Sequence, residues 1–111
     1  MPKNETERKR MTEPGVDRTV SVRLVGVFKK AYGKDRVTVE MRGKEALRDA
    51  IKRLVQSSPD LGRLLIDPEL GTPLPNAVIL VNGKEINLLN GLNTTLMGGD
   101  EVVLIPVIHG G

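Results

Sequence analysis

The feature that most limits the fold of this chain is one change of hydrophobic period. Residues 44–57 carry apolar side chains at every third or fourth position, whereas the segments on either side alternate with period two or are continuously apolar. The apolar stripe consists of Leu47, Ala50, Ile51, Leu54 and Val55. Charged residues occupy the other side, so the spacing predicts an amphipathic helix that lies on a sheet. Gly43 precedes this helix as a weak N-cap, and Pro59 stops it.

Two strands are predicted before the helix. Residues 19–28 begin with strict alternation and become apolar on both faces in their second half, which is typical of a strand. A polar turn at 29–34 contains Gly33, whose backbone tolerates turn conformations. The alternation of residues 36–42 predicts a second strand, and the two strands form a hairpin.

The segments after the helix are interrupted by turns. Residues 60–66 are compatible with a short helical turn, and 67–75 are rich in loop-forming Pro and Gly. The continuous apolar run at 77–81 predicts a central strand buried on both faces, which Asn82-Gly83 ends with a turn. The remaining predictions are a short strand at 86–89, a tight or helical turn at 92–97, a break at 98–100 and a last strand at 102–105.

This order of elements predicts an α+β fold. It consists of one mixed sheet of four to five strands, with one main helix packed on one face. Residues 1–18 hold few apolar side chains among many charges, so we expect them to form a disordered leader. The folded domain is expected to span 19–106, and 107–111 to form a flexible C-terminal tail.

Composition excludes several classes of function. The chain has no cysteine, which excludes disulfides, thiolate metal sites and cysteine nucleophiles. A net charge of +3 is spread over interleaved acidic and basic residues, and aromatic residues make up only 2%, so no nucleic-acid partner is predicted. Neither a secretion signal nor an apolar run long enough to span a membrane is present in the sequence, so we expect no membrane partner and a cytoplasmic location.

The end of the chain is the best candidate for chemistry. Five residues follow the last predicted strand: Val107, Ile108, His109, Gly110 and Gly111. Glycines without Cβ atoms can pass through a narrow channel and bring the terminal carboxylate close to a nucleotide. Attack of that carboxylate on the α-phosphate of ATP would give an acyl-adenylate, from which a sulfur or amine nucleophile displaces AMP. The chain has no P-loop pattern, so a partner must supply the ATP site.

Three motifs resemble a known family when they are taken together. They are Asn82-Gly83-Lys84, the segment from Leu96 through Gly98-Gly99-Asp100-Glu101 to Val102, and Pro106 followed by the terminal Gly110-Gly111. This order is similar to that of the β-grasp (ubiquitin-like) sulfur carriers. That group includes the small subunit of molybdopterin synthase, the thiamine sulfur carrier and the ubiquitin-related modifier.

The resemblance implies a carrier or modifier that partner enzymes act on, not an enzyme. Gly111 would be adenylated by an enzyme of the ubiquitin-activating type and converted to a thiocarboxylate by a sulfur donor, with Gly110, His109, Ile108 and Val107 recognised as the tail. The chain itself would bind no cofactor, and its partner would use ATP. Molybdopterin synthesis, with the large subunit of molybdopterin synthase as a further partner, is the pathway expected first. The His109 before the glycines is more similar to the ubiquitin-related modifier.

Other interpretations stay open at this point. The activated carboxyl would also serve a modifier conjugated to lysines of target proteins, or a sulfur donor for tRNA thiolation. A non-catalytic binding module with an inert tail is a third possibility. His109 is the only histidine, so no metal site is predicted, and no residue of the chain is predicted to be catalytic.

Overall fold

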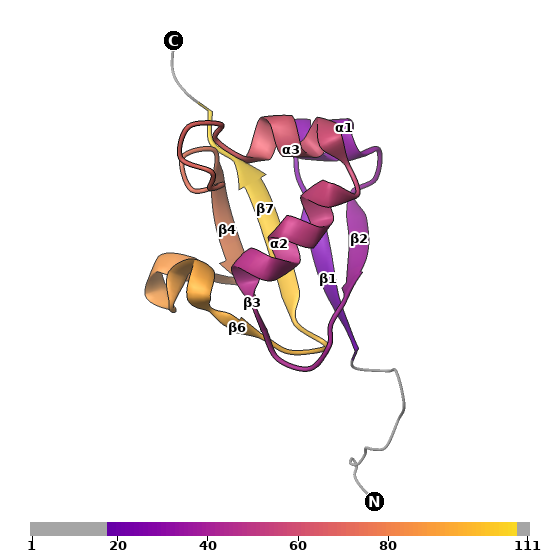
Figure 1. Cartoon of the computed structure of the whole chain (residues 1–111), viewed down its shortest axis with the longest axis vertical. Helices are drawn as coiled ribbons and strands as arrows, with labels where there is room; N and C mark the ends of the chain where they lie inside the picture. The colour runs from indigo at the N-terminus through magenta and orange to yellow at the C-terminus, as the bar shows by residue number, and fades with distance from the viewer. Residues whose placement is uncertain (1–17, 109–111) are drawn as a thin grey trace, which may run out of the picture.

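The computed structural model describes residues 18–108, which form one mixed sheet covered on one face by helices (Figure 1). The strand order is β2-β1-β7-β4-β5. These strands are β1 (Thr19–Leu24), β2 (Arg36–Glu40), β4 (Ala77–Val81), β5 (Lys84–Glu85) and β7 (Glu101–Pro106). Two short strands, β3 (Glu45–Ala46) and β6 (Thr95–Leu96), pair separately. The helices are α1 (Val27–Tyr32), α2 (Leu47–Gln56) and α3 (Pro59–Leu65), with single 3-10 turns η1 (Ile86–Leu88) and η2 (Gly91–Asn93).

The last strand, β7, occupies the centre of the sheet. It runs parallel to β1, with Leu24 opposite Leu104, and antiparallel to β4, with Ala77 opposite Pro106. β1 and β2 form the predicted antiparallel hairpin. The predicted α+β architecture, a five-stranded mixed sheet with a main helix on one face, is therefore confirmed.

A single aliphatic core lies between α2 and the sheet. Four residues of the predicted stripe of α2 are buried against alternate residues of β1, β4 and β7, and the fifth, Val55, is partly buried. The fully buried large side chains are Phe28, Leu24, Leu47, Leu61, Leu65, Ile79, Ile86, Leu96, Leu104, Val20 and Val102. The helix begins at Leu47, three residues later than predicted, because Glu45 and Ala46 pair with β6 instead. Pro59 ends this helix region as predicted and also begins α3, where Ser58 Oγ accepts a hydrogen bond from Leu61 N–H.

The predicted strand at 19–28 is wrong in its second half. The extended chain ends at Leu24, and Val27–Tyr32 form the helix α1 in place of a strand end and a polar turn. Gly26 takes a φ of +60°, which breaks the extended chain, and its carbonyl accepts the Lys30 N–H. Phe28 and Tyr32, four residues apart, share one face of this helix and pack on the core.

The prediction that 77–81 is buried on both faces is also wrong. Ala77, Ile79 and Val81 face the helices and are buried, but Val78 is 40% exposed and Leu80 is partly exposed. Among the described residues the helices cover only one face of the sheet, so the alternate side chains of β4 remain accessible.

Two further differences concern the ends of the chain and the segment 86–89. The predicted short strand there is the 3-10 turn η1, which leaves Leu88 78% exposed, whereas β5 is formed by the two residues before it. The predicted leader lies almost wholly outside the described residues, as do the last three residues of the predicted tail. None of the helices within 18–108 has the length and apolar character needed to cross a membrane.

Candidate functional site at the end of β7

Residues 107–108 follow β7 at the end of the sheet where that strand stops (Figure 1). Pro106 is the last residue of β7, and it lies opposite Ala77 of β4. The backbone N–H of Val107 donates a hydrogen bond to the Asn76 carbonyl at 2.9 Å, which extends the pairing by one residue. Ile108, the next residue, is 90% exposed. The chain is therefore held up to Val107, and the side chain of Ile108 lies free of the domain surface.

Pro106 ends the pairing of β7 with β1 for a chemical reason. Within β7, residues alternate between bonding to β4 and to β1, and the Leu104 carbonyl accepts the Val25 N–H on the β1 side. The nitrogen of Pro106 faces the same side but carries no hydrogen, so the parallel ladder cannot continue. The chain after β1 turns away at Gly26, which lies against the ring of Pro106.

An apolar surface extends from this exit along the uncovered face of the sheet. It is formed by Val78 and Leu80 of β4 and by Val103 and Ile105 of β7, which we call the outer apolar patch. Val78 lies opposite Ile105, and Leu80 lies opposite Val103, so the four side chains form two cross-strand pairs. Partly exposed apolar pairs of this kind are typical of a protein interaction surface.

The other half of the same face is polar. There the strands β1 and β2 present Ser21, Arg23, Arg36 and Thr38. The Arg36 guanidinium donates to Ser21 Oγ at 2.9 Å and pairs with Glu101 at 3.1 Å. The uncovered face thus has an apolar half beside the tail exit and a polar half with arginines next to it, a pattern that resembles the core and rim of an interface.

At the opposite end of β7, two of the family-like motifs, Asn82-Gly83 and Gly98-Gly99-Asp100, stabilise the start of the strand. One carboxylate oxygen of Asp100 accepts Asn82 Nδ2 at 3.0 Å, and the other accepts the Met97 N–H at 2.8 Å. The Asn82 side-chain oxygen accepts the Glu101 N–H at 2.9 Å. Asn82 itself has a φ of +50°, a conformation that Asn tolerates better than most residues. These contacts hold a turn at Asp100, where the sequence predicts a break at 98–100.

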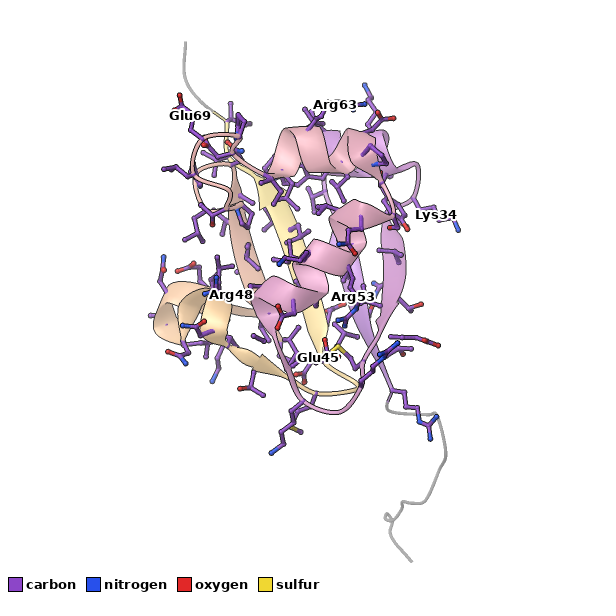
Figure 2. The ribbon with its side chains drawn as sticks, in the orientation of Figure 1. Lys34, Glu45, Arg48, Arg53, Arg63 and Glu69 are labelled. Atoms are coloured by element: carbon purple, nitrogen blue, oxygen red, sulfur yellow. The ribbon has the colours of Figure 1, made fainter. Side chains whose placement is uncertain are left out.

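An ion pair fixes the connection between β2 and α2 at this same end. Figure 2 shows the side chains of Glu45 and Arg53, whose Oε1 and Nη1 atoms are 2.5 Å apart. Glu45 also accepts the Arg42 N–H at 3.0 Å, and Arg53 donates to the Glu40 carbonyl at 2.9 Å. The Arg42 N–H and the Arg53 guanidinium together lower the pKa of the Glu45 carboxyl below its ordinary value. This cluster stabilises the domain and lies away from the tail exit.

The residues predicted as the site fall into two groups. Val107 and Ile108 lie at the exit, where Val107 is 36% exposed and Ile108 almost fully so. His109, Gly110 and Gly111 lie outside the described residues. Asn76, Gly26 and the outer apolar patch were not predicted as parts of the site. For the patch a signal existed, because β4 is apolar at every position although only one helical layer is predicted to cover the sheet.

A family comparison identifies the chain. The model of the ThiS family matches residues 22–111, which include the C-terminal segment and all of the sheet except the first three residues of β1. The chain belongs to the ThiS family. This family comprises ubiquitin-like sulfur carriers and modifiers, which confirms that the chain is a carrier or modifier and that its relatives are not catalysts themselves.

Similar proteins support the same assignment. Small archaeal modifier protein 3 of Haloferax volcanii is 28% identical over 93 residues, which cover 83% of this chain and 98% of the relative. The solution structure of small archaeal modifier protein 1 from Methanosarcina acetivorans has a TM-score of 0.74 and 26% identity, and the match covers 84% and 96% of the two chains. A chain of the BexX/CysO complex of Amycolatopsis orientalis shares the fold, with a TM-score of 0.67, 17% identity and coverage of 83% and 99%.

Proposed function

We propose that this ThiS-family chain is a sulfur carrier whose C-terminal Gly111 is activated by a ubiquitin-activating-type enzyme. A carboxylate oxygen of Gly111 attacks the α-phosphorus of ATP, and pyrophosphate leaves. Hydrosulfide, or a sulfur donor equivalent to it, then attacks the acyl carbon, and AMP leaves with the electron pair of the C–O bond. The product is a thiocarboxylate at Gly111, and the chain itself needs no cofactor because the partner binds ATP.

The observation that carries this proposal is the position of the chain end. Ile108 is 90% exposed and follows a central strand that is anchored on both sides. A central strand that leads to an exposed residue three positions before Gly111 suits presentation of a terminal carboxyl to a partner's nucleotide site. The inert binding module is less favoured, because it would give no reason for the apolar Val107 and Ile108 to stand at the exit.

The outer apolar patch is the surface on which the activating enzyme would dock. Val78, Leu80, Val103 and Ile105 lie on the same strands that lead to the exit, so docking there would fix the origin of the tail relative to the partner. An Ile105→Asp variant, which places a charge in the centre of this surface, should raise the KM for activation. The loss of folding stability in this variant is expected to be small, because Ile105 is already partly exposed.

The proposal is tested by intact-mass spectrometry. The purified chain is incubated with the adenylating enzyme of the same organism, Mg-ATP and sodium sulfide. Replacement of one carboxyl oxygen by sulfur adds about 16 Da, and the gain should map to the C-terminal peptide. An unchanged mass, with pyrophosphate release also absent, would refute the sulfur-carrier function.

A matched control separates the chemistry from docking. A chain extended by one serine after Gly111 keeps every described residue and the docking surface, but moves the terminal carboxyl. It should compete with the wild-type chain for the enzyme and acquire no sulfur. Sulfur uptake by the extended chain would place the modification somewhere other than the Gly111 carboxyl.

Conjugation to lysines is the second candidate function. It is favoured by the similarity to a small archaeal modifier protein over 83% of the chain. The same acyl-adenylate would then react with a lysine amine of a target protein to give an isopeptide bond at Gly111. Tryptic peptides of cell extracts in which a lysine carries residues 85–111 of this chain, the segment after its last trypsin site at Lys84, would support the modifier function. Their absence, together with a measured thiocarboxylate, would leave sulfur transfer alone.

The last part of the proposal concerns the pathway that receives the sulfur. We infer molybdopterin synthesis in the cytoplasm, with the large subunit of molybdopterin synthase as the partner that consumes the thiocarboxylate. Thiolation of tRNA is the alternative. Deletion of the gene followed by measurement of molybdopterin and of thiolated nucleosides distinguishes them, because only the pathway served should lose its product.

A further inference from the structure

The start of the C-terminal segment is held between two residues that are far from it in the sequence. On the β4 side, the Asn76 carbonyl accepts the Val107 N–H at 2.9 Å. On the β1 side, Gly26 lies so close that a Cβ atom on it would stand 3.2 Å from Cγ of Pro106. Within the described part of the chain, no hydrogen bond joins Asn76 or Gly26 to the outer apolar patch. We call these two contacts the exit clamp.

Asn76 is itself fixed by two further bonds. Its Nδ2 donates to the carbonyl of Leu65, the last residue of α3, at 3.2 Å, and its backbone N–H donates to the Pro73 carbonyl at 3.0 Å. These bonds orient the peptide that receives the Val107 N–H. The end of α3 and the loop before β4 are thereby coupled to the direction of the tail.

Gly26 meets a requirement that only glycine satisfies easily. Its φ of +60° and ψ of −129° lie in a region that L-residues with a Cβ avoid. This conformation turns the chain from β1 into α1 and leaves room for the ring of Pro106. A side chain at this position would both strain the backbone and push against Pro106.

We propose that Asn76 and Gly26 are positioning residues for activation, because the exit clamp sets the direction in which Ile108 and the residues after it leave the domain. This inference rests on the proposed activation of Gly111. The four residues beyond Val107 span at most about 14 Å when fully extended. Over so short a reach, a change of direction at the base displaces the carboxyl from the nucleotide, whereas docking on the sheet face is unaffected.

The deciding experiment measures adenylation kinetics with the chain as the varied substrate. Asn76→Asp is nearly isosteric but cannot donate to the Leu65 carbonyl. We expect its kcat to fall about tenfold while its KM changes less than about twofold, since misplaced reacting groups slow the chemical step. A kcat and KM equal to those of the wild-type chain would overturn the inference. So would a KM rise that tracks a loss of thermal stability, because that is the signature of a purely structural role.

Gly26→Ala provides a second variant with a matched control. Gly91 has nearly the same φ, +57°, but a Cβ placed there would meet no atom within 4 Å. Gly91→Ala should therefore leave kcat unchanged, whereas Gly26→Ala should lower it. If Gly26→Ala does not fold, Asn76→Asp decides alone. Equal kcat losses in the two alanine variants would assign the effect to backbone strain and refute the clamp.

One readout does not depend on the enzyme. The Val107 amide hydrogen should exchange faster in Asn76→Asp than in the wild-type chain, as measured by NMR, and unchanged exchange would refute the coupling between Asn76 and the tail. Failure of the wild-type chain to be adenylated would refute the proposed function and the inference with it. If the wild-type chain is adenylated and the variants have the same kcat as the wild-type chain, the inference is refuted and the proposed function stands.

Discussion

The two ends of β7 are stabilised in different ways. At its start, side chains add contacts to the backbone pairing: Asp100 accepts two hydrogen bonds, and the Asn82 side chain is bonded to both Asp100 and Glu101. At its end, the hydrogen bonds join backbone groups, from the Val25 N–H to the Leu104 carbonyl and from the Val107 N–H to the Asn76 carbonyl. The residue after Val107, Ile108, is almost fully exposed. The difference shows how one strand can be fixed by added side-chain hydrogen bonds where it enters the sheet and by backbone hydrogen bonds where it leaves. Changes at the start should therefore alter stability, and changes at the end should alter activation.

The largest effect on stability is expected between the two ends, where β7 crosses the core. Leu104 is completely buried, and Leu104→Ala should lower the free energy of unfolding by about 2–5 kcal/mol through lost burial and the cavity left behind. Urea denaturation measures the loss. Ile105→Ala, one residue further on the partly exposed face, is the matched control and should cost clearly less. Equal costs would mean that the uncovered face is buried in solution.

A smaller effect is expected at the start of β7. Asp100→Ala removes the acceptors of the Asn82 and Met97 bonds, and we expect a loss of about 1–2 kcal/mol, since hydrogen bonds to partly exposed groups have modest net value. Asp100→Asn keeps one acceptor oxygen and should lose less. Below the denaturation midpoint, the kcat of adenylation should equal that of the wild-type chain. A specific fall in kcat would show that the two ends are coupled.

The dependence of stability on pH tests the same end of the molecule. Because the folded state lowers the pKa of Glu45, its contribution is fully present above the pKa of the unfolded chain, about 4.3 for a glutamate, and is lost as the pH falls through the lower folded value. The stability difference between the wild-type chain and Glu45→Gln should therefore shrink as the pH is lowered from 6 to about 3. A difference in melting temperature that stays constant over this interval would contradict the shift. Adenylation at neutral pH should be the same for both chains.

The sequence predicted the start of β7 better than its end, and the reason is chemical. Asn82-Gly83 and Gly99-Asp100 are local turn signals, and their side chains bond to residues close by or directly across the sheet. The direction of the chain after β7 depends on Gly26 and Asn76. These residues contact Pro106 and Val107 only in the tertiary structure. No local pattern connects a glycine after the first strand with the last residue of β7.

The uncovered face was mispredicted for a different reason. Val78 and Leu80 have the composition of a buried strand, and a continuous apolar run gives the same pattern whether the second face meets a core or a partner. The apolar run at 25–28 was wrongly predicted as part of a strand for a similar reason, because Phe28 reaches the core from the helix α1. The amphipathic stripe of α2, in contrast, has a period that only a helix on a sheet satisfies. That helix was placed almost correctly.

The smallest effect on stability and a clear effect on activation are expected at the exposed end. Ile108 is 90% exposed, so Ile108→Ser should leave the melting temperature unchanged within error. If the activating enzyme binds the tail, the loss of an apolar contact should raise the KM for adenylation about tenfold or more, since burial of such a side chain contributes about 1.5–3 kcal/mol. Thermal denaturation and steady-state pyrophosphate release measure the two quantities. A lowered melting temperature would show that Ile108 packs on the domain, and the contrast between the two ends of β7 would then end one residue later in the chain.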